Sequence, residues 1–187
     1  MSKVGFALVV LAACGGNDAG SVSGTVHGGT VSVSDSVSAA IMINTNQHGA
    51  AILMTSTGGT CKDLMNRVEH PGEKAVIITV ADVNNLTLTT PTVPGTYSIY
   101  QGGQAPPKAA TLQVAVDDLN CKRVDNMGAK ATSGTVTIGE ISGNLFSGKY
   151  DVVLDSTDHI TGTFDPTECP AIQNAIDNSG SAASCLP

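Results

Sequence analysis

The chain has 187 residues, a length that suits one domain and can bury a real core. Apolar residues make up 41% of it and charged residues only 13%, a composition that excludes an intrinsically disordered chain. The formal charge is −7, and the nine basic residues are scattered, with Lys122-Arg123 as the closest cluster. Because phosphate binding needs clustered Lys and Arg, we expect no nucleic-acid partner.

The N-terminal segment has the layout of a secretory signal. Lys3 precedes an apolar run, 4–13, that ends in the small residues Ala12 and Ala13. As a helix this run rises about 15 Å, roughly half of a hydrocarbon core of about 30 Å. We therefore expect residues 1–13 to be a cleaved signal peptide and not a membrane-spanning helix.

The end of this signal carries the most specific motif of the chain. Leu11-Ala12-Ala13-Cys14 resembles the lipobox of bacterial lipoproteins. The resemblance implies a diacylglycerol on the Cys14 thiol, cleavage just before Cys14, and an anchor of two or three acyl chains, which holds stably to a membrane. In Gram-negative members of the family an Asp after the cysteine retains the protein at the inner membrane. Gly15 here favours the outer membrane.

Residues 14–20 are predicted to be a lipidated, flexible polar tether, and residues 21–187 a single β domain. The acidic body should be repelled by anionic headgroups, so we expect membrane attachment through the lipid. Apolar and polar residues alternate with period two in several runs, which is typical of antiparallel strands. The clearest of these runs are 111–116, 135–138 and 150–155. Two others, 50–54 and 76–80, predict strands that are buried on both faces.

Frequent Gly, Asn and Pro turns separate these runs, which favours a mainly β fold. We expect an antiparallel β-sandwich, or an open barrel, of about 8–10 short strands with one or two short helices. The last three strands, near 133–141, 144–155 and 159–165, should form a meander. Short fragments at 94–97, 133–136 and 161–165, the last running into Cys169, resemble uncharacterised β-rich lipoproteins of Gram-negative bacteria. This resemblance brings no activity with it.

Two segments favour short helices. Residues 61–66 could start from an N-cap at Thr60 and end before Pro71. Residues 170–176 place Pro170 in a first turn.

Four cysteines remain besides Cys14. Cys61, Cys121, Cys169 and Cys185 are an even number in a chain expected to be exported, which predicts two disulfides with three possible pairings. We favour Cys61–Cys121 and Cys169–Cys185, the latter closing a short C-terminal loop. Zinc is not expected, because the chain has no Cys-x-x-Cys and no His at ligand spacing.

The sequence gives little support for catalysis. It has no Gly-x-Ser-x-Gly elbow, and only Ser156, Asp158 and His159 supply the atom types of a hydrolytic triad close together. We expect a turn with an exposed His there. The remaining histidines, His27, His48 and His70, should be exposed loop residues. No catalytic residue is assigned.

Ligand sites receive similarly weak support. Five carboxylates could in principle gather around Ca²⁺, but their spacing does not match an EF-hand: Asp117, Asp118, Asp151, Asp155 and Asp158. Tyr97, Tyr150 and Phe164 should face inward, which leaves Tyr100 and Phe146 as candidates for a sugar-stacking platform. No metal or cofactor is expected.

The sequence therefore predicts a lipid-anchored protein of the cell envelope with a binding or structural role, and it is more consistent with a non-enzyme than with an enzyme. The expected partners are the membrane, through the lipid, and another envelope protein or a small ligand. Two alternatives stay open: a divergent envelope hydrolase, and a carrier with an apolar internal cavity.

Overall fold

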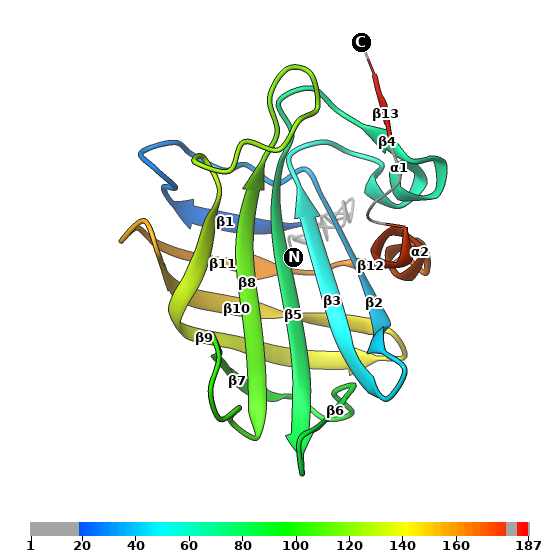
Figure 1. Ribbon diagram of the computed structural model, residues 1–187, viewed down its shortest axis with the longest axis vertical. Helices are drawn as coiled ribbons and strands as arrows, with labels where there is room; N and C mark the ends of the chain where they lie inside the picture. Colours follow the sequence, from blue (N-terminus) through cyan, green and yellow to red (C-terminus); the bar gives the residue numbers. More distant parts are fainter. Residues whose placement is uncertain (1–18, 179–182, 187) are drawn as a thin grey trace, which may run out of the picture.

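The computed structural model describes residues 19–178 and 183–186 and is mainly β (Figure 1). Cys14, the predicted signal peptide and most of the predicted tether lie outside these residues. Two short helices accompany the strands, α1 (Thr60–Asn66) and α2 (Ala171–Asp177). The strands are β1 (Gly20–Gly24), β2 (Asp35–Asn44), β3 (Gln47–Thr55), β4 (Val68–Glu69), β5 (Lys74–Asn84), β6 (Thr87–Thr89), β7 (Gly95–Ile99), β8 (Lys108–Val116), β9 (Ala129–Ser142), β10 (Leu145–Leu154), β11 (His159–Phe164), β12 (Thr167–Glu168) and β13 (Ser184–Cys185).

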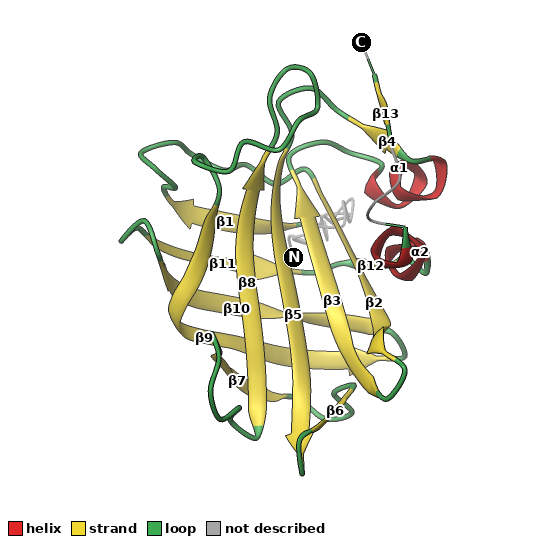
Figure 2. Ribbon diagram, in the orientation of Figure 1, coloured by secondary structure: helices red, strands yellow, loops and turns green. Residues whose placement is uncertain are grey.

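One curled sheet makes up most of the molecule. Its strand order is β1-β11-β10-β9-β7-β8-β5-β3-β2-β12, with β6 attached to β5. All pairings in it are antiparallel except β7–β8 and β2–β12. Strands β2, β3, β5 and β8 run lengthwise in Figure 2, and β9, β10, β11 and β1 cross behind them, so the sheet forms a half-barrel. The predicted β fold with short helices is confirmed, as is the final meander β9-β10-β11.

Of the two architectures left open, the structure has the open barrel, because β9 joins the two layers into one sheet. Its first residues pair with β8, Lys130 opposite Gln113, and its later residues pair with β10 and β7. The corner carries a register shift between Val153 and Leu154 and a positive φ of 111° at Gly134. Bulges and glycines are the usual means by which a strand turns such a corner.

The concave side of the sheet is filled by side chains. The largest of the fully buried ones are Tyr97, Phe146 and Phe164. Tyr150 packs over Gly162 and donates a hydrogen bond from its hydroxyl to the carbonyl of Ser21 on β1, 3.2 Å away. A Cβ at Gly162 would collide with that hydroxyl. The predicted inward positions of Tyr97, Tyr150 and Phe164 are confirmed.

Both helices lie on the convex side, next to β2 (Figure 1). They cover a second, smaller apolar cluster of Val37, Ala39, Ile41, Ala51, Cys169, Ala171 and Ile172. Pro170 occupies the N-cap position of α2. Within residues 19–178 and 183–186, neither helix has the length and apolarity to cross a membrane.

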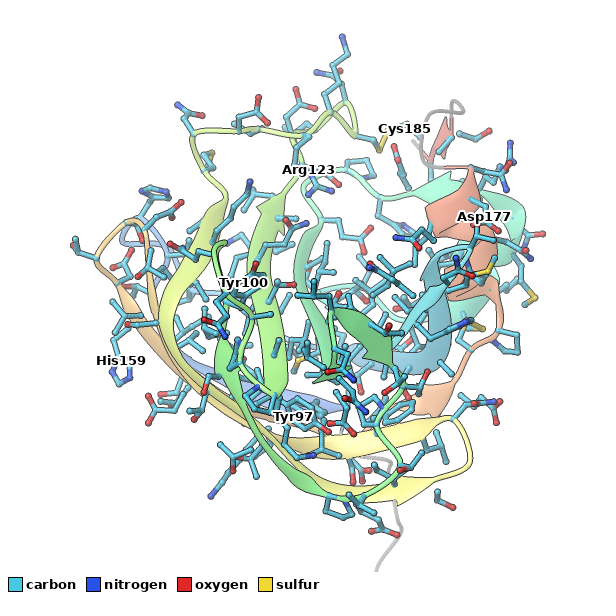
Figure 3. The ribbon with its side chains drawn as sticks, turned by 60° about the horizontal axis from the view of Figure 1, so that its bottom comes forward. Tyr97, Tyr100, Arg123, His159, Asp177 and Cys185 are labelled. Carbon is cyan, nitrogen blue, oxygen red and sulfur yellow. A yellow bond between two sulfur atoms is a disulfide. The ribbon has the colours of Figure 1, made fainter. Side chains whose placement is uncertain are left out.

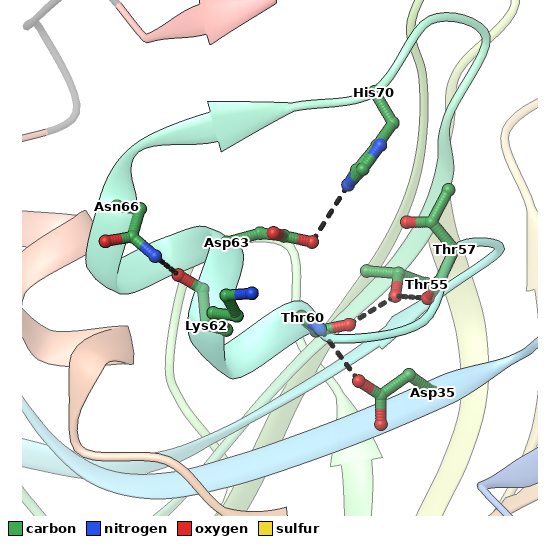
Figure 4. Close-up of polar contacts among 8 residues, drawn as sticks. All are labelled: Asp35, Thr55, Thr57, Thr60, Lys62, Asp63, Asn66 and His70. Atoms are coloured by element: carbon green, nitrogen blue, oxygen red, sulfur yellow. Dashed lines mark hydrogen bonds and ion pairs between the residues drawn. The ribbon is translucent and has the colours of Figure 1, made fainter. Parts of the chain in front are cut away.

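Helix α1 is held to the sheet by polar contacts at its first residue (Figure 4). The backbone N–H of Thr60 donates to Asp35 Oδ2 at 2.8 Å, and the Thr60 hydroxyl contacts that of Thr55. The prediction that Thr60 caps this helix is wrong, since Gly59 occupies the N-cap in a left-handed conformation. The Thr60 side chain is turned toward β3 and is therefore not free to cap.

The disulfides pair differently from the favoured prediction: Cys61 bonds to Cys169, and Cys121 to Cys185. The reason lies in long-range pairing. Strand β12 pairs with β2, and the N–H of Cys169 bonds to the carbonyl of Ser38, which places this cysteine under α1. Strand β13 pairs with β4, which carries Cys185 to the rim near Cys121.

The two disulfides should contribute unequally to stability. Replacing both Cys61 and Cys169 with Ser is expected to lower the free energy of unfolding by about 2–5 kcal/mol. This bond closes the longer loop, a separation of 108 against 64, and fastens both helices to the sheet. Ser at Cys121 and Cys185 should cost less. Denaturant unfolding measures both losses, and peptide mapping without reduction checks the pairing. A cross-linked peptide joining Cys61 to Cys121 would contradict it.

Candidate binding surface

The convex face of β3, β5 and β8 carries no charge, although the chain as a whole is acidic. Side chains of these strands alternate between the core and this face. The outward positions are Gly49, Ala51, Leu53, Ala75, Ile77, Thr79, Ala81, Ala109, Thr111, Gln113 and Ala115. Outer faces of antiparallel sheets are normally polar. A smooth, uncharged outer face of this kind is typical of a surface that another element covers.

One row across this face runs from apolar to polar. Strand register places Leu53 opposite Ile77, Ile77 opposite Gln113, and Gln113 opposite Lys130. Leu53, Ile77 and Gln113 are half-buried, and Lys130 is exposed. A ligand lying along this row would meet aliphatic surface first, then an amide and then an ammonium group.

Helix α2 turns the apolar part of this face into a groove. The groove has a volume of about 500 Å³; Leu53 and Ile77 lie on its floor, and Ile172, Ala175 and Ile176 form its helical wall. Ile176 remains 39% exposed, a large fraction for an isoleucine beside an apolar groove. Leu64 of α1 and Arg123 also line it.

The face continues past Gln113 toward Tyr100. A second hollow of about 480 Å³ shares Ile77, Thr79 and Gln113 with the groove and extends it to Tyr100 and Lys130. The Tyr100 hydroxyl donates to the carbonyl of Gly103 at 2.8 Å, which fixes the ring in its loop. Tyr100 and Arg123 are labelled in Figure 3.

The part of this face formed by β5 and β8, here called the uncovered strip, is about one helix wide. Within the described residues, α2 packs on the β2 side of the sheet and reaches only as far as Ala51 on β3, so no helix lies over β5 and β8 (Figure 1). The accessible part of these two strands is their middle, at Ile77, Thr79, Thr111 and Gln113, because Ala81, Ala109 and Ala115 are buried. Two strands span about 10 Å, close to the diameter of a helix.

The prediction that 50–54 is buried on both faces is confirmed for Ala51. For 76–80 it is wrong, because Ile77 and Thr79 are half-exposed on this strip.

The candidate triad is not assembled. The Ser156 hydroxyl donates to Asp158 at 2.8 Å, whereas His159 contacts Asp151 on the neighbouring strand at 2.6 Å. Asp158 also accepts from the backbone N–H of His27 at 2.7 Å. The hydrogen bond from Ser156, followed by that from His27, lowers the pKa of the Asp158 carboxyl. Asp158 therefore holds a turn and the loop at residue 27 together.

The other sequence candidates are dispersed. His27 contacts the carbonyl of Gly128 at 3.1 Å, and His70 contacts Asp63 at 2.9 Å and is half-buried, contrary to the expectation of an exposed residue. Asp117 pairs with Arg123 at 2.8 Å, and the carboxylates proposed for Ca²⁺ hold separate turns and strands. Among the described residues, no three His, Cys, Asp or Glu side chains come together as a metal site would require. Phe146 is fully buried, so it forms no sugar platform with Tyr100.

A further polar cluster closes one end of the barrel and was not predicted. The buried Tyr97 hydroxyl donates to Asp82 at 3.0 Å, and Lys108 donates to the same carboxylate at 3.0 Å while its ammonium lies over the Tyr97 ring. Burial raises the pKa of Tyr97, which keeps the phenol neutral as a donor. Figure 3 places Tyr97 at the opposite end from Arg123 and Cys185.

Comparison of the chain with models of known families, with characterised proteins and with solved structures found no match. The functional argument therefore starts from the residues. One sequence signal could have revealed the uncharged face: the runs 47–55, 75–81 and 109–116 contain no Asp, Glu, Lys or Arg.

Proposed function

We propose that this protein is a lipid-anchored component of the bacterial cell envelope, held at the outer membrane, that acts as a non-enzymatic binding module. The observation that carries the binding role is the uncharged outer face of β3, β5 and β8 with its groove beside α2. The support for the anchor is the Leu11–Cys14 motif, which follows a basic residue and an apolar run.

The partner is an amphipathic helix of another envelope protein. The uncovered strip is one helix wide, and α2 shows on the neighbouring strip how such a helix packs on this sheet, with Ala171 and Ile172 against Ala39 and Ala51. An uncharged face also avoids the repulsion that other surfaces of an acidic chain would impose on acidic partners. Gln113 and Arg123 at the border supply hydrogen-bond donors that can fix the register of the helix.

A hydrolase or a carrier has less support. Ser156 and His159 each bond to a different carboxylate, so the nucleophile and base of an acyl-transfer mechanism are not in contact. The concave side of the sheet, where a barrel-type carrier holds its ligand, is occupied by Tyr97, Phe146 and Phe164.

The anchor is tested by intact mass. Protein from the membrane fraction of a Gram-negative host should have lost residues 1–13 and gained the mass of two or three acyl chains. The Cys14→Ser variant should keep its signal segment or lack the acyl mass. A wild-type chain that is full-length, unmodified and soluble would contradict the anchor.

The binding face is tested by site-directed photo-cross-linking in the envelope. A benzophenone amino acid at Gln113 should give one discrete adduct with a second envelope protein, and the same probe at Thr137, on the polar outer face, should not. Ile77→Asp places a carboxylate on the groove floor, where an unpaired buried charge costs several kcal/mol, so the adduct should fall about tenfold or more. Circular dichroism checks that this variant folds. Equal adducts at both positions, or none at Gln113, would contradict the proposal.

A further inference from the structure

The molecule has an end whose turns contain no charged residue, with one exposed carboxylate, Glu140 of β9, level with Val93 by the β7–β9 register. In Figure 1 the turn between β2 and β3, the turn between β5 and β6, and the segment from β6 to β7 lie together at the lower end. These segments belong to the stretches 36–61 and 83–107, which contain no Asp, Glu, Lys or Arg. The adjoining Asp82 and Lys108 neutralise each other in an ion pair at 3.0 Å.

Exposed apolar side chains project from this uncharged end. Leu86 is 84% exposed, Val93 57% and Ile43 40%. Ile43 lies over Gly49, whose carbonyl accepts a hydrogen bond from Thr90, so Ile43 and the segment that carries Val93 lie close together. Met42, 45% exposed, adds a fourth large apolar side chain to this end.

Leu86 is held in a backbone conformation that its residue type disfavours. Asn85 and Leu86 are the two central residues of the β5–β6 hairpin turn and have φ values of 48° and 67°. A turn with two positive φ angles prefers Asn-Gly, because glycine has no Cβ to strain. Leucine here gains no burial in return. An exposed leucine at a glycine position indicates a contact outside the folded chain.

We propose that the uncharged end rests on the bilayer, with the Leu86 side chain inserted among the lipids. This contact rests on the lipid anchor proposed above. The segment from Cys14 to Ala19 spans at most about 20 Å when fully extended, so an anchored domain stays against the membrane and one of its surfaces must face it. Turns without charged residues meet less repulsion from anionic headgroups than the acidic surfaces of this chain do. Aliphatic side chains at loop tips are suited to enter the acyl region.

The chain contains no tryptophan, so the insertion can be read with a single reporter. Lipidated Leu86→Trp protein is reconstituted in vesicles of phosphatidylethanolamine and phosphatidylglycerol that contain phospholipid brominated on its acyl chains. Its fluorescence should shift to shorter wavelength and be quenched. A Thr135→Trp variant, which places the reporter on the polar outer face, should show neither change. Flotation of the vesicles checks that both variants stay bound through the anchor.

The outcomes separate the two proposals. No quenching at position 86 in protein that floats with the vesicles overturns the contact and leaves the anchor intact, and equal quenching at both positions also overturns it. Protein that does not float overturns the anchor. The Leu86→Gly variant gives a second readout. It should unfold no more easily than wild type, because glycine suits the turn. The Cys14→Ser, Leu86→Gly double variant should nevertheless bind vesicles more weakly than the Cys14→Ser variant does. Equal vesicle binding would overturn the role of Leu86.

Discussion

The tight packing of aromatic side chains against glycines on the concave side of the sheet is the constraint on which the architecture depends. Tyr150 occupies the space left by Gly162, and Phe164 lies against Gly148. The Tyr150 hydroxyl also holds the edge strand β1 through the carbonyl of Ser21. With the interior closed in this way, the sheet has its convex side left for recognition.

The two halves of that convex side differ in chemistry. Across β9, β10 and β11 it presents hydroxyls and charges: Thr135, Thr137, Lys149, Asp151, Thr161 and Thr163. Across β3, β5 and β8 it presents small, aliphatic and uncharged polar side chains. Both halves share one core, so core packing alone does not require this difference. A charged half suited to water and an uncharged half suited to a partner explain it.

Much of the fold followed from the sequence, because period-two patterns and turn residues are local signals. The meander of β9, β10 and β11 and the inward position of Tyr97 are examples. The disulfide pairing did not follow, since it depends on β12 pairing with β2 and β13 with β4, contacts between segments far apart in the sequence. The groove was missed for a related reason. Ile77 was predicted to be covered, and only the position of α2 reveals that its cover stops at β3.

The Leu11–Cys14 motif and the uncharged face of β3, β5 and β8 support different parts of the proposed function. The proposed location rests on Leu11–Cys14, whereas the proposed binding role rests on the face around Ile77. The polar clusters that the sequence offered for chemistry prove to be structural in their contacts, as Asp158 illustrates by bonding Ser156 and the backbone of His27. Binding by an apolar surface is the role that these observations support jointly.

Hydroxyl-radical footprinting tests this central claim most directly. The rate of side-chain oxidation is compared between the protein in intact envelopes and the purified Cys14→Ser protein in solution. If the uncharged face is covered by a partner, oxidation of Leu53, Ile77 and Ile176 falls in the envelope, while that of Val153 on the charged half is unchanged. If these residues are oxidised equally in both samples, the uncharged face is not a binding surface.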